Sequence, residues 1–165
     1  MASTYTQIYI HTVMVVKGRM NHISPEWKNQ LCKYITGIVL HKKCKVMVIN
    51  GMHDHLHILL SIGPDRALSD LMRDIKANSS RWINEKRYIS GKFEWQTGFG
   101  AFSVSKSQVE KVARYIEKQE VHHRKKTFRE EYVGFLQAYS VDYKAEFIFE
   151  DFGIAPSELM ERKRS

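Results

Sequence analysis

His55 and His57 flank a single apolar residue, Leu56, inside a short apolar run that ends at Gly63-Pro64. A run of this length and composition predicts a β-strand. Side chains two apart on a strand point to the same face, so both imidazoles should lie side by side, with Cα atoms about 7 Å apart. Two such rings can bind one metal ion, but they are also common as core residues, and a closed structural zinc site needs four ligands. The pair therefore indicates a metal site only together with a second element.

Tyr115 and Gln119 are the candidates for that second element. They lie four residues apart in a segment with helical apolar spacing, which predicts that they share one side of a helix. They flank the apolar stripe, so its packing can hold the tyrosine while the hydroxyl faces a cleft. The side-chain carbonyl oxygen of Gln119 suits a hard metal ion as a third ligand. The alternative interpretation is a surface tyrosine and glutamine on an amphipathic helix.

The first part of the chain predicts the strands that would carry the histidines. Strands are expected over residues 4–16, 45–50 and 55–62, and the turn near Gly51 predicts that the last two pair as a hairpin. Between the first two strands, Ser24 can cap a helix that has Pro25 at its first position and runs to about residue 41.

The second part of the chain predicts a helix from residue 67 to about 88 and a strand over 93–104, kinked at Gly98 and Gly100. A third helix opens at Ser105 or Ser107, each of which matches a capping box, and ends near the basic cluster 122–126; a fourth covers 128–139. The order β-α-β-β-α-β predicts an α+β fold with a ferredoxin-like or RRM-like antiparallel sheet. We expect its helices mainly on one face, and Tyr115 on a helix in the C-terminal half.

Length and composition are those of a single soluble domain over residues 1–165, with a flexible basic tail expected after about residue 156. The apolar stretch near the N-terminus lacks a basic region before it, so it predicts a strand instead of a signal peptide. Apolar runs are too short to span a membrane. Cys32 and Cys44 do not form a CxxC pair, which argues against a disulfide framework or a cysteine zinc site and fits a reducing cytoplasm.

The net charge of +8 suggests a polyanionic partner, with nucleic acid first. Basic side chains decorate the second predicted helix and follow the third. The ordinary interpretation of such residues is a solvated face, but in a chain this basic they also predict a surface that contacts phosphates. The candidates for DNA binding are Arg73, Lys76, Arg81, Lys86, Arg87, Lys125 and Lys126.

Taken in order along the chain, the His55-Leu56-His57 triplet and the Tyr115–Gln119 pair resemble the motifs of the single-tyrosine HUH transposases, the enzymes of the smallest bacterial insertion sequences. The REP-associated tyrosine transposases are related to these enzymes. The resemblance extends from the first strand to about residue 139. One departure is His53, where the family usually has proline; it is a spare ligand, a phosphate contact or, as we favour, a simple replacement. The matching stretches are Met52–Leu59, Phe99–Ser105, Tyr115–His123 and Phe128–Tyr132.

The resemblance implies that His55, His57 and Gln119 hold one divalent ion, Mg²⁺ or Mn²⁺, and that Tyr115 is the nucleophile. Cleavage would leave a 3′-OH and a 5′-phosphotyrosine that another DNA end can reseal. No nucleotide cofactor is needed, in keeping with the lack of a Walker-type loop in the sequence. The implied substrate is single-stranded DNA with hairpins, and the implied assembly is a homodimer.

The sequence does not identify the base that would activate the tyrosine; His122 and His123 are the candidates. Three other functions remain open: a domesticated relative that binds genomic hairpins, a metal-dependent phosphohydrolase that uses water, and a basic nucleic-acid-binding module without cleavage. The last would not need His55, His57 and Tyr115 together.

Overall fold

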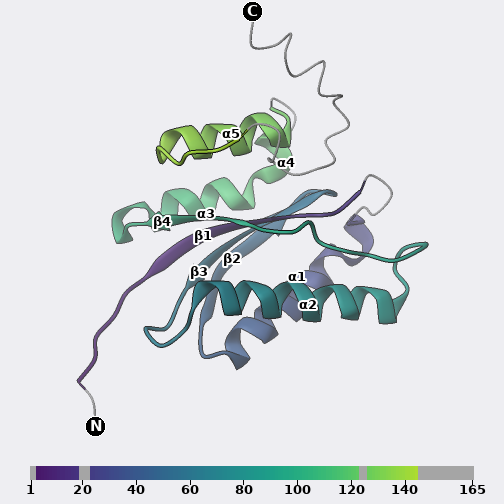
Figure 1. Ribbon diagram of the computed structural model, residues 1–165, viewed down its shortest axis with the longest axis horizontal. Coiled ribbons are helices and arrows are strands. Elements are labelled where there is room, and N and C mark those ends of the chain that lie inside the picture. Colours follow the sequence, from purple (N-terminus) through teal and green to yellow (C-terminus); the bar gives the residue numbers. More distant parts are fainter. Residues whose placement is uncertain (1–2, 19–22, 123–125, 145–165) are drawn as a thin grey trace, which may run out of the picture.

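A four-stranded antiparallel sheet forms the centre of the computed structural model, which describes residues 3–18, 23–122 and 126–144 (Figure 1). The strands lie in the order β2-β3-β1-β4, so that β1 and β3 are central. This arrangement and the β-α-β-β-α-β succession confirm the predicted α+β fold. The strands are β1 (Tyr9–Val15), β2 (Lys45–Gly51), β3 (His55–Ser61) and β4 (Gly100–Val104).

The two longest helices, α1 (Pro25–His41) and α2 (Leu68–Lys86), pack on one face of the sheet (Figure 1). The predicted start of α1 is confirmed, since the Ser24 side chain accepts a hydrogen bond from the backbone N–H of Glu26. The residues of β3 that point to this face are Leu56, Ile58 and Leu60, and all three are fully buried in the main core. The alternate residues of β3 must therefore point to the opposite face.

Shorter helices lie over that opposite face: α3 (Val109–Glu117), α4 (Gln119–His122) and α5 (Phe128–Ala138), after a 3₁₀ turn over Lys106–Gln108. Leu59 of β3 packs in a cluster with residues of α3. A second cluster joins β1 and β4 to α5. It consists of Val13, Val15, Phe102, Phe128, Tyr132 and Leu136. This is the face on which the histidines of β3 lie.

The predicted strand over residues 93–104 is too long, because β4 begins only at Gly100. Residues 94–96 form only an isolated bridge to the end of β1, with Trp95 opposite Val16, and side chains bind other backbone groups of the segment. Asn84 both donates to the carbonyl of Phe93 and accepts from its N–H. The Lys76 ammonium donates to two more carbonyls of this segment. β1 is also shorter than predicted, since it starts at Tyr9, opposite the ends of β3 and β4.

The third predicted helix is interrupted. The predicted capping box is wrong: the hydroxyls of Ser105 and Ser107 contact each other at 3.1 Å, and neither caps α3. α3 ends at Glu117, and Gln119 begins α4. The side chain of Asn50 donates to the carbonyls of Ile116 and Glu117, both at 3.1 Å, and so replaces hydrogen bonds that a continuous helix would supply. Tyr115 and Gln119 thus lie on two successive helices instead of one.

Gly100 allows α5 to approach the sheet closely. A Cβ atom at this position would lie 2.6 Å from the Tyr132 hydroxyl and 2.8 Å from its ring. We therefore expect Gly100→Ala to lower the free energy of unfolding by about 1–3 kcal/mol, measured by urea denaturation. Gly134→Ala, on the same helix with nothing near its Cβ, is the control and should stabilise by up to about 1 kcal/mol. Equal stability of the two variants would contradict this packing.

Candidate metal and tyrosine site

Both histidines of β3 are fully buried between the sheet and the helices that cover this face. Their ring centroids are 5.1 Å apart and the ring planes are nearly perpendicular. The His55 ring also stacks on Phe128 at the start of α5, with centroids 4.1 Å apart. The two imidazoles are therefore held in defined orientations by the packing of α5.

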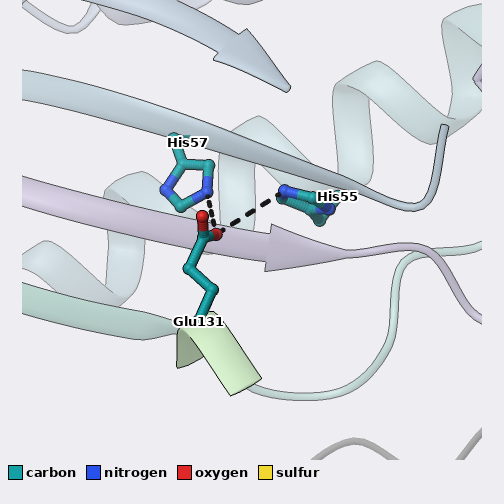
Figure 2. A group of neighbouring side chains, drawn as sticks. All are labelled: His55, His57 and Glu131. Carbon is teal, nitrogen blue, oxygen red and sulfur yellow. Dashed lines mark hydrogen bonds and ion pairs between the residues drawn. The ribbon is translucent and has the colours of Figure 1, made fainter. Parts of the chain in front are cut away.

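Glu131 on α5 provides the carboxylate that the histidines face (Figure 2). Its Oε1 lies 2.8 Å from Nε2 of His57 and 3.9 Å from Nε2 of His55. One ligand atom from each of the three residues lies within 4.8 Å of the others. The carboxylate is buried in the first turn of its helix, where the backbone N–H groups favour negative charge.

Tyr115 and Gln119 complete the cluster from the other side. The Tyr115 hydroxyl donates a hydrogen bond to Oε2 of Glu131, the oxygen not used by His57. Oε1 of Gln119 lies 3.1 Å from Nε2 of His55, and its amide donates weakly to Glu131 at 3.5 Å. The interruption of the helix has thus not separated these two side chains.

Comparison with known proteins identifies the family. The family described as "Transposase IS200 like" matches residues 4–119, well over half of the chain. The chain belongs to this family. Among curated proteins, the ISDra2 transposase TnpA of Deinococcus radiodurans is 26% identical over 118 residues, which cover 68% of this chain and 84% of the relative.

Solved structures support the fold of this IS200-like transposase. A crystal structure described as that of a transposase from Deinococcus radiodurans R1 has a TM-score of 0.57 and 19% identity, covering 72% of this chain and 95% of the other. A REP-associated tyrosine transposase bound to a REP hairpin has a TM-score of 0.58 and 15% identity, covering 93% and 94%. At these identities the likeness concerns the fold alone.

The remaining ring nitrogen of each histidine also has a partner in the transposase. Nδ1 of His55 lies 2.7 Å from Oδ1 of Asp54, and Nδ1 of His57 lies 2.8 Å from Nε2 of His11. Burial opposes ionisation of Asp54, but the hydrogen bond and charge of His55, with the charge of His53, lower the pKa of Asp54 overall. Burial, with the charge of His57, lowers the pKa of His11 to about 3. Such partners fix which nitrogen of a histidine faces a metal.

The electrostatics of the cluster keep Tyr115 protonated without a cation. Burial raises the pKa of Tyr115, and the hydrogen bond to Glu131 and the negative charge of Glu131 raise it further. A divalent cation near Glu131 would oppose that charge and favour the phenolate. The reactivity of Tyr115 in this transposase therefore depends on whether a cation also binds the Glu131 carboxylate.

The donor atoms fit a divalent metal ion. Two imidazole nitrogens, one carboxylate and one amide oxygen converge from β3, α4 and α5. Oxygen donors suit Mg²⁺ and Mn²⁺, and the added nitrogens favour Mn²⁺ of the two. The ligands that the sequence predicted are thus joined by a carboxylate that it did not assign to the site.

The basic residues of α2 lie on the other face of the sheet from this cluster (Figure 1). A groove of about 980 Å³ lies between α2 and residues 92–99, and its lining includes Arg73, Lys76 and Arg81 of α2 and Arg87, the residue that follows the helix. Within it, the Lys76 ammonium is bonded to the carbonyls of Gln96 and Gly98, and burial lowers its pKa. The exposed Lys86 lies outside the groove lining.

The candidates near the end of the chain are only partly described. Lys126 is exposed just before α5. Lys125 and His123 lie outside the described residues, as do the side chain of His122 and the tail expected after residue 156. His53 is exposed and precedes β3, with Nε2 3.9 Å from Asp54 Oδ2. No helix in the described ranges is long and apolar enough to cross a membrane.

Proposed function

We propose that this IS200-like transposase cleaves and rejoins single-stranded DNA through a covalent bond to Tyr115, and so moves an insertion sequence. The observation that carries the proposal is the meeting of the Tyr115 hydroxyl with the two histidines of β3 at one buried carboxylate. A nucleophile placed beside a metal-binding set is the arrangement that phosphoryl transfer needs. Membership of the transposase family supports the same reaction.

In the proposed step, the Tyr115 oxygen attacks the scissile phosphorus and the bond from phosphorus to the 3′ oxygen breaks. The phenolic proton leaves to solvent or a nearby base, and the departing oxygen takes up a proton to become a 3′-OH. One phosphodiester is exchanged for another, so a second 3′-OH can reverse the step without a nucleotide cofactor. Glu131 holds the Tyr115 hydroxyl before attack, which fixes the nucleophile beside the histidines.

His55, His57 and Gln119 are the proposed ligands of a divalent ion, Mn²⁺ or Mg²⁺, with Glu131 as an added ligand. When bound, such an ion would withdraw charge from the phosphate and stabilise the transition state. The ligand side chains are buried, so their own orientations do not have to be established when DNA arrives. The free thiols Cys32 and Cys44 fit a reducing cytoplasm as the place of action.

DNA hairpins are the proposed partner, supported by the relative whose structure contains a REP hairpin. We propose that the groove beside α2 contacts hairpin phosphates, because its lining carries three arginines and two lysines against two glutamates. Replacing Arg73 and Arg81 together with alanine should weaken hairpin binding and reduce the slope of log affinity against log salt by about one for each phosphate that is no longer bound. The control is the pair Lys45→Ala and Lys111→Ala, which removes two exposed charges outside the groove. Identical salt slopes for both pairs would exclude the groove.

A homodimer is the proposed assembly. Each chain has one proposed nucleophilic tyrosine and can make one cut at a time, whereas a mobile element has two ends to be cut. Within one chain, Tyr115 already reaches Glu131 beside His57. We therefore expect a mixture of Tyr115→Phe and His57→Ala proteins to form no covalent DNA adduct. Adduct formation by the mixture would instead mean that the tyrosine of one subunit serves the histidines of the other.

A domesticated hairpin-binding relative is the second candidate. The observation that favours it is the fold match over 93% of this chain to the REP-associated enzyme, whose structure contains a bound REP hairpin. Such a protein would act on genomic repeats instead of moving an element. Matched subterminal hairpins on both sides of the gene would favour the mobile element, and their absence the domesticated function.

The test of the main proposal is a covalent-adduct assay. Wild-type protein with Mn²⁺ or Mg²⁺ is incubated with single strands from the DNA flanking its gene, labelled at either end, and products are separated on a denaturing protein gel. We expect the 3′-labelled fragment to migrate with the protein, the 5′-labelled fragment to be free, and both products to disappear with EDTA. Cleavage without any protein-linked fragment would instead indicate a hydrolase that uses water.

A further inference from the structure

His11 is a buried polar residue on β1 to which the proposed reaction assigns no role. It is 2% exposed and lies on the same face of the sheet as the site. Two aromatic rings hold its orientation: Phe135 of α5, with centroids 5.2 Å apart, and Phe102 of β4, at 6.3 Å, both edge-on. An imidazole confined in this way cannot rotate freely, so its contacts are part of the fold.

The His11 ring makes a polar contact with a residue of the metal-binding set. Its Nε2 lies 2.8 Å from Nδ1 of His57, and both atoms are buried. Because the two nitrogens of an imidazole point in different directions in the ring plane, a partner at Nδ1 keeps Nε2 pointing toward Glu131, whose Oε1 lies 2.8 Å away. Rotation of the His57 ring by half a turn would lose both contacts.

Asp54 contacts the Nδ1 atom of His55, just as His11 contacts the Nδ1 atom of His57. Its carboxylate contacts Nδ1 of His55 at 2.7 Å, while Nε2 of that ring faces Gln119. Each proposed histidine ligand therefore has a partner at Nδ1 and presents Nε2 to the cluster. Asp54 is adjacent in sequence to its histidine, whereas His11 comes from a neighbouring strand.

We propose that His11 is a positioning residue of the metal centre, which holds His57 with Nε2 toward the cluster and accepts the Nδ1–H hydrogen bond when that Nε2 binds a divalent cation. The inference rests on the metal site of the proposed function. Its chemical basis is that a histidine ligand binds through an unprotonated nitrogen, and a hydrogen bond at the other nitrogen fixes both the tautomer and the direction of the ring.

The test compares three replacements of His11 by Mn²⁺ titration calorimetry on the full chain. His11→Gln places an amide near the position of Nε2 and can still contact His57, whereas His11→Asn carries the same amide too short to reach it. His11→Leu removes the polar group altogether. We expect Asn and Leu to weaken Mn²⁺ binding by about 10–100-fold and Gln to restore most of the wild-type affinity. Urea denaturation of each variant identifies any loss of folding, and the Gln and Asn pair decides if Leu fails to fold.

The wild-type and His57→Ala proteins separate failure of this inference from failure of the proposed function. If wild type does not bind Mn²⁺, or binds it equally well without His57, the metal site itself is wrong and the role of His11 falls with it. If wild type binds through His57 but the Asn and Leu variants match it, only the role of His11 is overturned. That role is also overturned if Gln is as weak as Leu, because the weaker binding would then follow from packing and not from the hydrogen bond.

Discussion

Tyr115→Phe should abolish the covalent protein–DNA adduct, by at least about 10³-fold, while binding of the hairpin stays close to wild type. Phenylalanine has no oxygen that can attack phosphorus. The ring itself should remain in place, since it packs edge-on against Phe135, with centroids 5.7 Å apart, and near His57 at 6.0 Å. Adduct is measured on denaturing gels with labelled single strands, and binding by native gel shift.

Tyr139→Phe is the matched control. This exposed tyrosine directly follows α5 as its C-cap, where its ring centroid lies 4.9 Å from that of Phe102. It loses the same hydroxyl and should retain adduct formation. Adduct formation that survives in Tyr115→Phe but falls in Tyr139→Phe would show that Tyr139, and not Tyr115, is the nucleophile.

Local sequence patterns were enough to predict the order of strands and helices and the orientation of the two histidines. The alternation of β3 fixes His55 and His57 on one face, because Leu56 and Ile58 must be buried on the other. The spacing of four residues that pointed to Tyr115 and Gln119 predicts a single helix, whereas the structure places them on two successive helices that still bring both side chains to the histidines. In each case the information lies within one turn of helix or a few residues of strand.

The parts that the sequence did not predict depend on contacts between distant residues. The break after Glu117 is stabilised by Asn50, 67 positions away in the chain. Glu131 joins the site through His57, 74 positions away, and His11 through the same ring, 46 positions away. The sequence does contain a signal for Glu131, because this charged residue interrupts the apolar spacing of α5. That the residue is buried, and which residues it contacts, can be identified only in the three-dimensional structure.

Glu131→Gln tests whether that carboxylate belongs to the reaction. The change keeps the size of the side chain but removes its charge, so the amide can still contact the Tyr115 hydroxyl while it offers a metal ion a weaker ligand. We expect Mn²⁺ affinity to fall by at least about 10-fold, because a charged oxygen donor is lost from a buried set. Adduct formation at a fixed, low Mn²⁺ concentration should fall by about 100-fold, since the nucleophile and the ligand set share this one group.

Glu130→Gln provides the comparison, because Glu130 is the exposed neighbour on the same first turn of α5 and loses the same charge. Its Mn²⁺ affinity and adduct yield should equal those of wild type, which separates a local effect from the general loss of one negative charge. Raising Mn²⁺ then distinguishes two roles of Glu131. Recovery of the adduct at saturating Mn²⁺ means that the carboxylate acts mainly as a ligand, whereas a persistent defect means that it acts mainly on Tyr115. If Glu131→Gln matches Glu130→Gln in both measurements, the carboxylate is a packing feature of α5, and the site must function with the histidines, Gln119 and the tyrosine alone.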